Sequence, residues 1–170
     1  MTDSGTGKRL VAYFSASGVT GRAARALAQA AGADLFEIVP EEPYTTADLD
    51  WRNRRSRSSL EESDPSVRPA VSSAVGDMDA YDTVFVGFPI WWGHEPAIVD
   101  TFLEQYDFSG KVVAPFATSG GSGASGSDRR LRAACPTAGE LLPAKLVNGM
   151  GADALGTWAA SVARYRGGCQ

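Results

Sequence analysis

The sequence predicts an α/β fold in which helices cover both faces of a parallel β-sheet. Two observations lead to this fold class. Several short segments are apolar throughout rather than alternating between apolar and polar residues, as strands buried on both faces are. Segments with the apolar spacing of helices separate them along the chain. Strands that alternate with helices in this way are typical of parallel sheets.

The first half of the chain supplies three predicted strands and one predicted helix. LVAYF (10–14) is the first strand, and GVTGRAARALAQAAG is an amphipathic helix that Gly32 ends. ADLFEIV (33–39) is predicted as the second strand, and the continuously apolar TVFVGF (83–88) as the third.

The second half repeats the alternation. PAIVDTFLEQY (96–106) has helical spacing, and its proline suits the start of a helix. KVVAPFA (111–117) is the fourth predicted strand, and DRRLRAAC (128–135) is predicted as a helix. AKLVNGM (144–150) is expected to be the fifth strand, followed by a closing helix over 152–165.

Residues 40–79 interrupt the alternation. The segment is rich in Pro, Ser, Arg and acidic residues, with Tyr44 and Trp51 as isolated aromatic residues. A long excursion in a compact domain is usually functional or disordered. We interpret it as an insertion between the second and third strands of a single domain (1–170), which begins with a flexible N-terminus at 1–8.

Composition excludes several classes of protein. The 170-residue chain has a net charge of −4, whereas nucleic-acid binders usually carry a basic face. One histidine and two distant cysteines, Cys135 and Cys169, make a zinc site or a disulfide framework improbable. No window approaches the roughly 18 apolar residues of a membrane span. We expect a cytoplasmic protein without a nucleic-acid partner.

The stretch YFSASGVT places three hydroxyl residues where the first strand turns into a helix. The N-terminus of a helix attracts anions, Ser15, Ser17 and Thr20 add donors, and Gly18 permits close approach. A phosphate dianion could be held here without Lys or Arg. The alternative is an ordinary helix cap, which needs only one hydroxyl. The P-loop and dinucleotide-binding glycine patterns are absent.

The stretch FPIWWGHEP (88–96) follows the third strand. Adjacent residues of an extended segment point in opposite directions, so Trp91 and Trp92 cannot readily share one interior. We expect at least one of them to stack on a planar ring system. The alternative is that both pack into the core.

The stretch ATSGGSGASGSD (117–128) follows the fourth strand. Its glycines let the backbone approach a flat ligand closely, and hydroxyl residues that precede them can donate hydrogen bonds. The alternative is a flexible linker. The residues concerned are Thr118, Ser119, Gly120, Gly121, Gly123 and Gly126.

A phosphate seat, an aromatic wall and a glycine-rich rim together match flavin mononucleotide (FMN). The stretches YFSASGVT, YDTVFVGFPIWWG and YDFSGKVVAPFATSGGSG resemble those of the flavodoxin family, in the branch with a long insertion after the second strand. The resemblance extends from about Arg9 to Asn148. It implies a flavodoxin-like three-layer sandwich, with a five-stranded parallel sheet of order 2-1-3-4-5 and FMN at the carboxyl ends of the strands.

The resemblance also implies which residues bind FMN. The phosphate would be held by Ser15, Ser17, Gly18, Val19 and Thr20. One side of the flavin would be lined by Pro89, Ile90, Trp91, Trp92 and Gly93, and the other by Thr118, Ser119, Gly120, Gly121 and Gly123. The loop formed by ATSGGSG departs from the electron-carrier flavodoxins because it has neither an aromatic nor an acidic residue. The last twenty or so residues of the chain are also less typical of the family.

The function expected from these features is electron transfer through non-covalently bound FMN. The alternative is an NAD(P)H-dependent reductase of quinones or similar small acceptors, so the partner is either a redox protein or a small acceptor. Because only Glu95 and Asp128 lie at the margins of the two ring-binding loops, we expect a flavin less strongly reducing than that of acidic carriers. His94 is either a proton donor near the flavin or a surface imidazole.

The arginines of WRNRRSR in the insertion also have two interpretations. They either form a solvated loop paired with nearby glutamates, or a cationic rim that attracts a nicotinamide phosphate or an acidic redox partner. These residues are Arg52, Arg54, Arg55 and Arg57.

Other classes that use α/β folds fit less well. Phospho-acceptor receiver domains need acidic residues after the first and central strands, where this chain has Ser15 and Pro89. A serine hydrolase is disfavoured because GGSGA is one residue short of its motif and His94 precedes the serine. A module that has lost its flavin is opposed by the intact hydroxyls and tryptophans.

Overall fold

The computed structural model describes residues 7–167 and contains one sheet, in which all strand pairs are parallel. The strand order is β2-β1-β3-β4-β5, with β6 also paired to β4, which confirms the predicted order 2-1-3-4-5. The strands are β1 (Lys8–Tyr13), β2 (Asp34–Glu37), β3 (Tyr81–Pro89), β4 (Val112–Thr118), β5 (Glu140–Leu141) and β6 (Lys145–Leu146).

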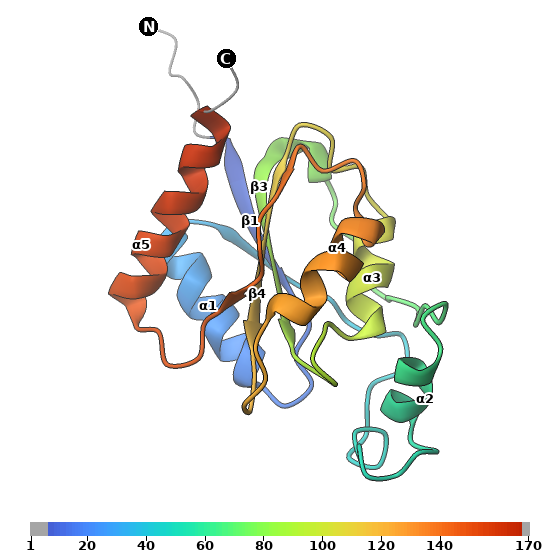
Figure 1. Cartoon of the computed structure of the whole chain (residues 1–170). Helices are drawn as coiled ribbons and strands as arrows, with labels where there is room; N and C mark the ends of the chain where they lie inside the picture. The colour runs from blue at the N-terminus through green and yellow to red at the C-terminus, as the bar shows by residue number, and fades with distance from the viewer. Residues whose placement is uncertain (1–6, 168–170) are drawn as a thin grey trace, which may run out of the picture.

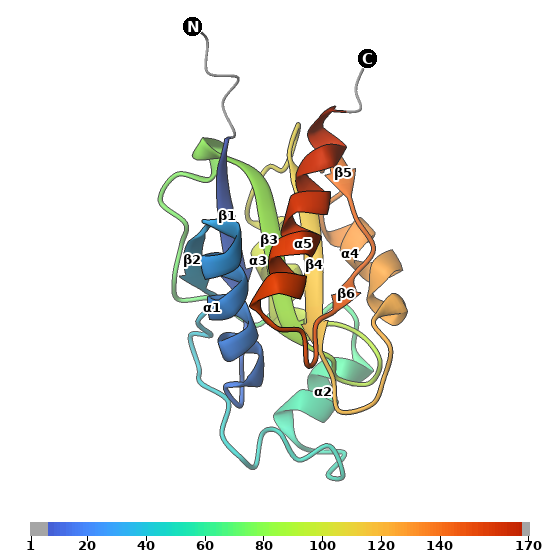
Figure 2. The same cartoon turned by 90° about the vertical axis from the view of Figure 1, so that its left-hand side faces the viewer.

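Helices cover both faces of the sheet and complete the three-layer sandwich (Figure 1). The helices α1 (Val19–Ala31) and α5 (Ala152–Ala163) lie side by side on one face, as Figure 2 shows from the front. The other face carries α3 (Ala97–Glu104) and α4 (Asp128–Ala134). These helices lie where the sequence predicted them, with ends that differ by one or two residues.

The strands divide the core into two layers because successive side chains point to opposite faces of the sheet. In β1, Val11 and Tyr13 join the cluster beneath α1 and α5, whereas Leu10 and Ala12 join the cluster beneath α3 and α4. Both faces of each central strand are therefore apolar, which explains the continuous apolar runs in the sequence.

The predicted fifth strand at 144–150 is wrong in its extent, because two short strands replace it. Leu142 N donates to Val113 O, and Val147 N donates to Ala117 O, so these positions of β4 face the edge occupied by β5 and β6. Pro115 lies midway between them and has no N–H to donate. Pro143 interrupts the outer segment between β5 and β6. The two prolines explain why the strand is split.

The insertion joins β2 to β3 and extends beyond the carboxyl ends of the strands. An antiparallel bridge between Pro40 and Val71 closes its base, and it contains α2 (Arg57–Ser63), whose N-terminus is capped by Ser56. A short 3₁₀ turn, Met78–Ala80, leads into β3. Figure 1 shows α2 at the lower end of the molecule, where the loops that follow β1, β3 and β4 also lie.

The flexible N-terminus predicted at 1–8 lies mostly outside the described residues. Lys8 is an exception, because it is the first residue of β1 and is paired with Tyr81 of β3. Cys169 also lies outside the described residues, whereas Cys135 is a buried free thiol.

Candidate functional site

The loop between β1 and α1 is closed by its own serine. Ser15 Oγ accepts hydrogen bonds of 3.1 Å from the backbone N–H groups of Gly18 and Gly21. Gly18 has a φ of 93°, in the left-handed region that favours glycine. Ser15 therefore performs the capping role that the sequence left as an alternative.

The first turn of α1 keeps further amides available. Within the described part of the chain, the backbone N–H groups of Ser17, Val19 and Thr20 make no hydrogen bond. They lie at the N-terminus of a helix of 13 residues, where the helix dipole is positive. Arg22 Nη1 lies 3.8 Å from the position that a Cβ on Gly18 would take. Sequence reasoning missed this guanidinium, which adds positive charge to the loop.

A hydroxyl pair joins the first loop to the end of β4. Thr20 Oγ1 and Thr118 Oγ1 are 2.8 Å apart, and both residues are buried. The next residue, Ser119, exchanges two hydrogen bonds with the amide of Asn148, at 2.8 and 2.9 Å. Thr20 is therefore a connection between two loops rather than a freely exposed hydroxyl.

The loop after β3 is a tight hairpin turn. Trp91 N donates to His94 O at 3.0 Å, and His94 N donates to Trp91 O at 3.2 Å. The two residues between them, Trp92 and Gly93, have φ values of 51° and 82°, as a type I′ turn requires. Trp92 is the only non-glycine residue with a positive φ between residues 7 and 167. Such strain costs about 1–3 kcal/mol and concentrates at functional sites.

The turn separates the two tryptophans. Trp91 packs against the core, with its ring centroid 5.6 Å from that of Phe14 and 5.5 Å from that of Tyr44. Trp92 is 42% exposed. The expectation that the two would not share one interior is confirmed, although a turn rather than an extended segment is the cause.

The glycine-rich loop after β4 leaves open space beside its backbone. A Cβ added to Gly120, Gly121 or Gly123 would meet no atom within 4 Å. Gly126 differs, because its Cβ would lie 2.2 Å from the carbonyl oxygen of Gly93. This glycine is required where the third loop packs against the hairpin turn.

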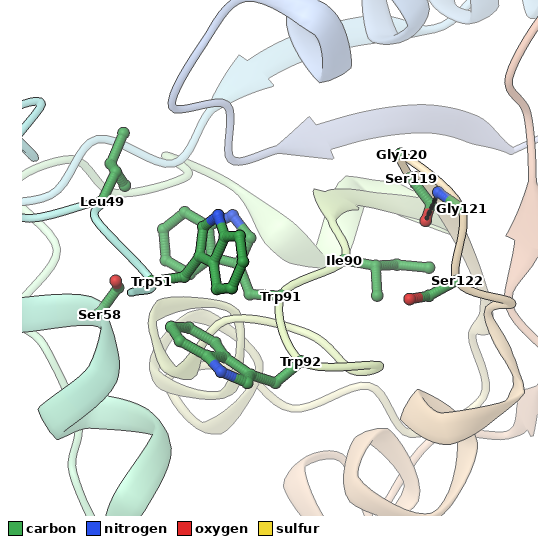
Figure 3. Close-up of a pocket in the computed structure, with 10 residues that line it drawn as sticks. All are labelled: Leu49, Trp51, Ser58, Ile90, Trp91, Trp92, Ser119, Gly120, Gly121 and Ser122. Carbon is green, nitrogen blue, oxygen red and sulfur yellow. Dashed lines mark hydrogen bonds between the residues drawn. The ribbon is translucent and has the colours of Figure 1, made fainter. Parts of the chain in front are cut away.

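A pocket of about 660 Å³ lies between the hairpin turn after β3, the glycine-rich loop after β4 and the insertion. Figure 3 shows the tryptophans gathered at one end, the serine- and glycine-rich loop at the other, and Ile90 between them. The pocket is lined by Leu49, Trp51, Ser58, Ile90, Trp91, Trp92, Ser119, Gly120, Gly121 and Ser122.

The structure brings together only part of the predicted site. From the predicted set, Ile90, both tryptophans and Ser119–Gly121 line the pocket. The phosphate-loop residues lie outside its lining and are joined to it through Thr20 and Thr118. Sequence reasoning missed Leu49, Trp51, Ser58 and Ser122. An isolated tryptophan in a polar segment was the one signal that could have indicated Trp51.

The insertion is docked on the site by aromatic and charged contacts. Tyr44 lies against both Phe14 and Trp91, and its hydroxyl donates to Glu61 at 2.6 Å. Burial and this carboxylate raise the pKa of Tyr44. Arg57 pairs with Glu61 at 3.0 Å and lies 3.9 Å from the centroid of the Tyr44 ring. Arg57 is thus a structural arginine.

The other three arginines of WRNRRSR remain accessible. Arg52 approaches Asp50 only at 4.0 Å, with 81% of its side chain exposed. Arg54 and Arg55 make no ion pair within the described residues. The four arginines therefore divide between the two interpretations of the sequence.

His94 connects the hairpin turn to α2. Its Nδ1 lies 2.8 Å from the carbonyl oxygen of Glu95, and its Nε2 lies 2.5 Å from Glu62 Oε2, without the alignment of a hydrogen bond. The imidazole is partly buried, so His94 is not an exposed surface histidine.

Two carboxyl groups are buried next to this loop. Glu95 is fully buried and accepts a hydrogen bond of 2.9 Å from Arg130 Nε, while Asp100 Oδ2 lies 3.5 Å from Arg130 Nη2. Burial, followed by the negative charge of Glu95, raises the pKa of Asp100 to about 8. At neutral pH the Asp100 carboxyl therefore keeps its proton.

Among residues 7–167, no group of three or more His, Cys, Asp or Glu side chains could hold a metal ion. The same part of the chain contains no helix of the length and hydrophobicity that a membrane span needs.

The fold and the pocket define a class of protein: a doubly wound α/β domain with a pocket at the carboxyl edge of its sheet. The family model described as "Flavodoxin" matches residues 8–162. The chain belongs to the flavodoxin family.

Solved structures give the same result. A protein from Bacteroides eggerthii DSM 20697, provisionally described as a flavoprotein, is 47% identical, with 92% of this chain and 98% of that chain covered and a TM-score of 0.87. A similarly described protein from Bacteroides uniformis ATCC 8492 is 46% identical, with coverage of 91% and 98% and a TM-score of 0.85. A flavoprotein from Lactobacillus acidophilus NCFM in complex with FMN shares the fold at 21% identity, with coverage of 82% and 93% and a TM-score of 0.65. No curated protein matches the chain.

Proposed function

We propose that this protein binds FMN non-covalently and serves in redox reactions. The main support is that two features lie at the same edge of the sheet. They are the unpaired backbone amides at the start of α1 and an open pocket lined by aromatic side chains. The solved FMN complex of the Lactobacillus acidophilus flavoprotein, which has the same fold, supports this choice of ligand.

The residues fit the phosphate of FMN. The amides of Ser17, Val19 and Thr20 offer donors that the fold itself does not use, and Ser17 is exposed. Ser15 holds the loop in this conformation, and Arg22 supplies charge beside it. A helix N-terminus with free amides is a suitable seat for a dianion.

The residues also fit the flavin ring. Trp92 offers an exposed indole, and the open space beside Gly120, Gly121 and Gly123 admits a flat group against the backbone. Bound FMN would supply one- or two-electron chemistry, and the protein would orient it and set its electrostatic surroundings.

The surroundings of the pocket support a flavin that is less strongly reducing than in acidic carriers. An uncompensated charge about 8 Å away would disfavour an anionic reduced flavin by roughly 2 kcal/mol. Glu95 is instead compensated by Arg130, and Asp128 Oδ1 accepts a hydrogen bond from Ala144 N. A redox titration is expected to give a higher midpoint for full reduction than in acidic carriers, and an equally low midpoint would contradict the assignment.

A comparison of two ligands tests the binding proposal. FMN and riboflavin differ only in the phosphate, so calorimetry should show FMN binding at least 100-fold more tightly. Ser17→Ala should weaken FMN binding and leave riboflavin binding unchanged. If the protein stays colourless and produces no heat with saturating FMN, the proposal is wrong. Equal affinity for both ligands would reject the phosphate seat alone.

A reductase of small acceptors is the second candidate function. The concave pocket beside Trp51 supports it, because a small planar molecule could enter there. Steady NADPH oxidation with a quinone would favour the reductase, whereas transfer only to a protein partner would favour the carrier. The proposal places the protein in the cytoplasm, which agrees with the free thiol of Cys135.

A further inference from the structure

We propose that Trp51 and Ser58 of the insertion form a binding site for a planar aromatic ligand that carries a carbonyl oxygen, the class to which quinones belong. The inference rests on the proposed function, because the site shares its pocket with the flavin-binding loops. It assigns a role to an insertion segment that the phosphate and ring contacts do not use.

The position of Trp51 favours a planar aromatic ligand. Its side chain is among the most exposed large apolar groups of the described chain, at 68%, yet it lines a pocket rather than a convex surface. Trp91 and Trp92 line the same pocket from the hairpin turn. Indole surface gathered from two distant segments favours a flat aromatic ligand, because offset stacking on such rings is favourable.

The hydroxyl of Ser58 favours a ligand that carries a carbonyl oxygen. This residue is 3% exposed and lines the pocket, and its Oγ has no hydrogen-bond partner among the described residues. A buried hydroxyl without a partner is unfavourable, so a ligand that accepts its hydrogen bond would be preferred. This preference selects a carbonyl-bearing ring over a pure hydrocarbon.

The side of the pocket that the insertion forms is held in place. Tyr44 packs on Trp91, Arg57 bonds the carbonyl oxygen of Glu42 at 2.6 Å, and His94 meets Glu62 of α2. The contacts of Tyr44 and Glu62 tie the insertion to the hairpin turn on both sides of Ser58, and the bond from Arg57 to Glu42 joins two parts of the insertion. A pre-formed concave site suits a small molecule, whereas a protein partner would need a broad surface.

The test measures binding of 1,4-naphthoquinone to the FMN-loaded, oxidised protein by equilibrium dialysis. Trp51→Ala is expected to raise the Kd about fivefold, within the range measured for aromatic pairs. Ser58→Ala should raise it about threefold, and should leave the Kd of naphthalene, which has no carbonyl group, unchanged. Leu60→Ala is the matched control, because Leu60 is an exposed apolar residue of α2 outside the pocket lining.

The outcomes separate the inference from the proposed function. FMN affinity is measured first, and a wild-type protein that binds no FMN overturns the proposed function and this inference with it. If FMN binds and Trp51→Ala leaves the naphthoquinone Kd unchanged, only the inference fails. If Trp51→Ala weakens FMN binding more than naphthoquinone binding, Trp51 covers the flavin itself and the inference is again wrong.

Discussion

The loops that follow β1 and β3 both lead from a strand to a helix, but different chemistry stabilises each of them. The first loop is closed by a neutral hydroxyl, Ser15, which satisfies two amides of α1. The second turns on a strained tryptophan, Trp92, and leads into buried carboxyl groups at Glu95 and Asp100. The phosphate side of the site should therefore be insensitive to pH, whereas the ring side should respond to it.

The largest expected effect is a pH dependence of stability that comes from Asp100. Below about pH 4 this carboxyl is protonated in both the folded and unfolded states. As the pH rises, the unfolded state releases the proton, whereas the folded state keeps it up to its pKa of about 8. The free energy of unfolding should therefore fall across this window, by at most about 1.4 kcal/mol per pH unit, and level off above it.

Urea denaturation between pH 4 and 9 measures this effect. Asp100→Asn cannot ionise, so the difference between the wild-type and variant curves isolates the titration of Asp100. Parallel curves for the two proteins would show that Asp100 does not hold the proton.

Loss of the buried ion pair between Glu95 and Arg130 should have the next largest effect on stability. Glu95→Ala leaves Arg130 without its hydrogen-bonded partner and is expected to lower the free energy of unfolding by about 3 kcal/mol. Glu104→Ala is the matched control, because Glu104 pairs with Arg68 at an exposed position and should cost at most about 1 kcal/mol. Equal losses in the two variants would contradict the contrast between buried and exposed pairs.

A substitution in the loop after β1, which a neutral hydroxyl closes, should cost less stability than loss of the buried ion pair. Ser15→Ala removes the acceptor of two amide hydrogen bonds and should cost about 1–2 kcal/mol of stability, with the same loss at pH 5 and pH 8. Ser17→Ala should leave stability unchanged, because Ser17 makes no hydrogen bond within the described residues. A loss that varies strongly with pH would remove the distinction between the loops.

Substitution of Trp92 should have the smallest effects, and they should differ in sign between stability and FMN binding. Trp92→Asn suits the left-handed conformation, so it should stabilise the fold by about 1 kcal/mol. The same change removes the exposed indole and should weaken FMN binding about fivefold. Thermal unfolding and calorimetry measure the two quantities, and a destabilised variant would show that Trp92 is not strained.

Local patterns predicted most of the fold. Continuous apolar runs mark strands buried on both faces, and the hydroxyl cluster at Ser15 marks the start of α1. The split between β5 and β6 was not predictable in the same way, because it depends on which residue of β4 faces the outer edge. The register places Pro115 at that edge, and register is a property of strand pairing rather than of a single segment.

The site was predicted less completely for a related reason. The two tryptophans and the glycine-rich loop were recognisable because each follows a predicted strand. Trp51 and Ser58 reach the pocket only because the insertion docks through Tyr44 and Glu62, contacts that join residues far apart in sequence. The burial of Glu95 is equally non-local, since its partner Arg130 lies on another helix.

The broken outer border of the sheet has a consequence for how the molecules behave at high concentration. An uninterrupted border strand offers a row of donors and acceptors that a neighbouring molecule can extend into a shared sheet. Here the border consists of two two-residue pieces with Pro143 between them, opposite a position of β4 that has no donor. The same prolines that shorten the strand therefore leave this border without a continuous row of donors and acceptors for a neighbouring molecule to extend.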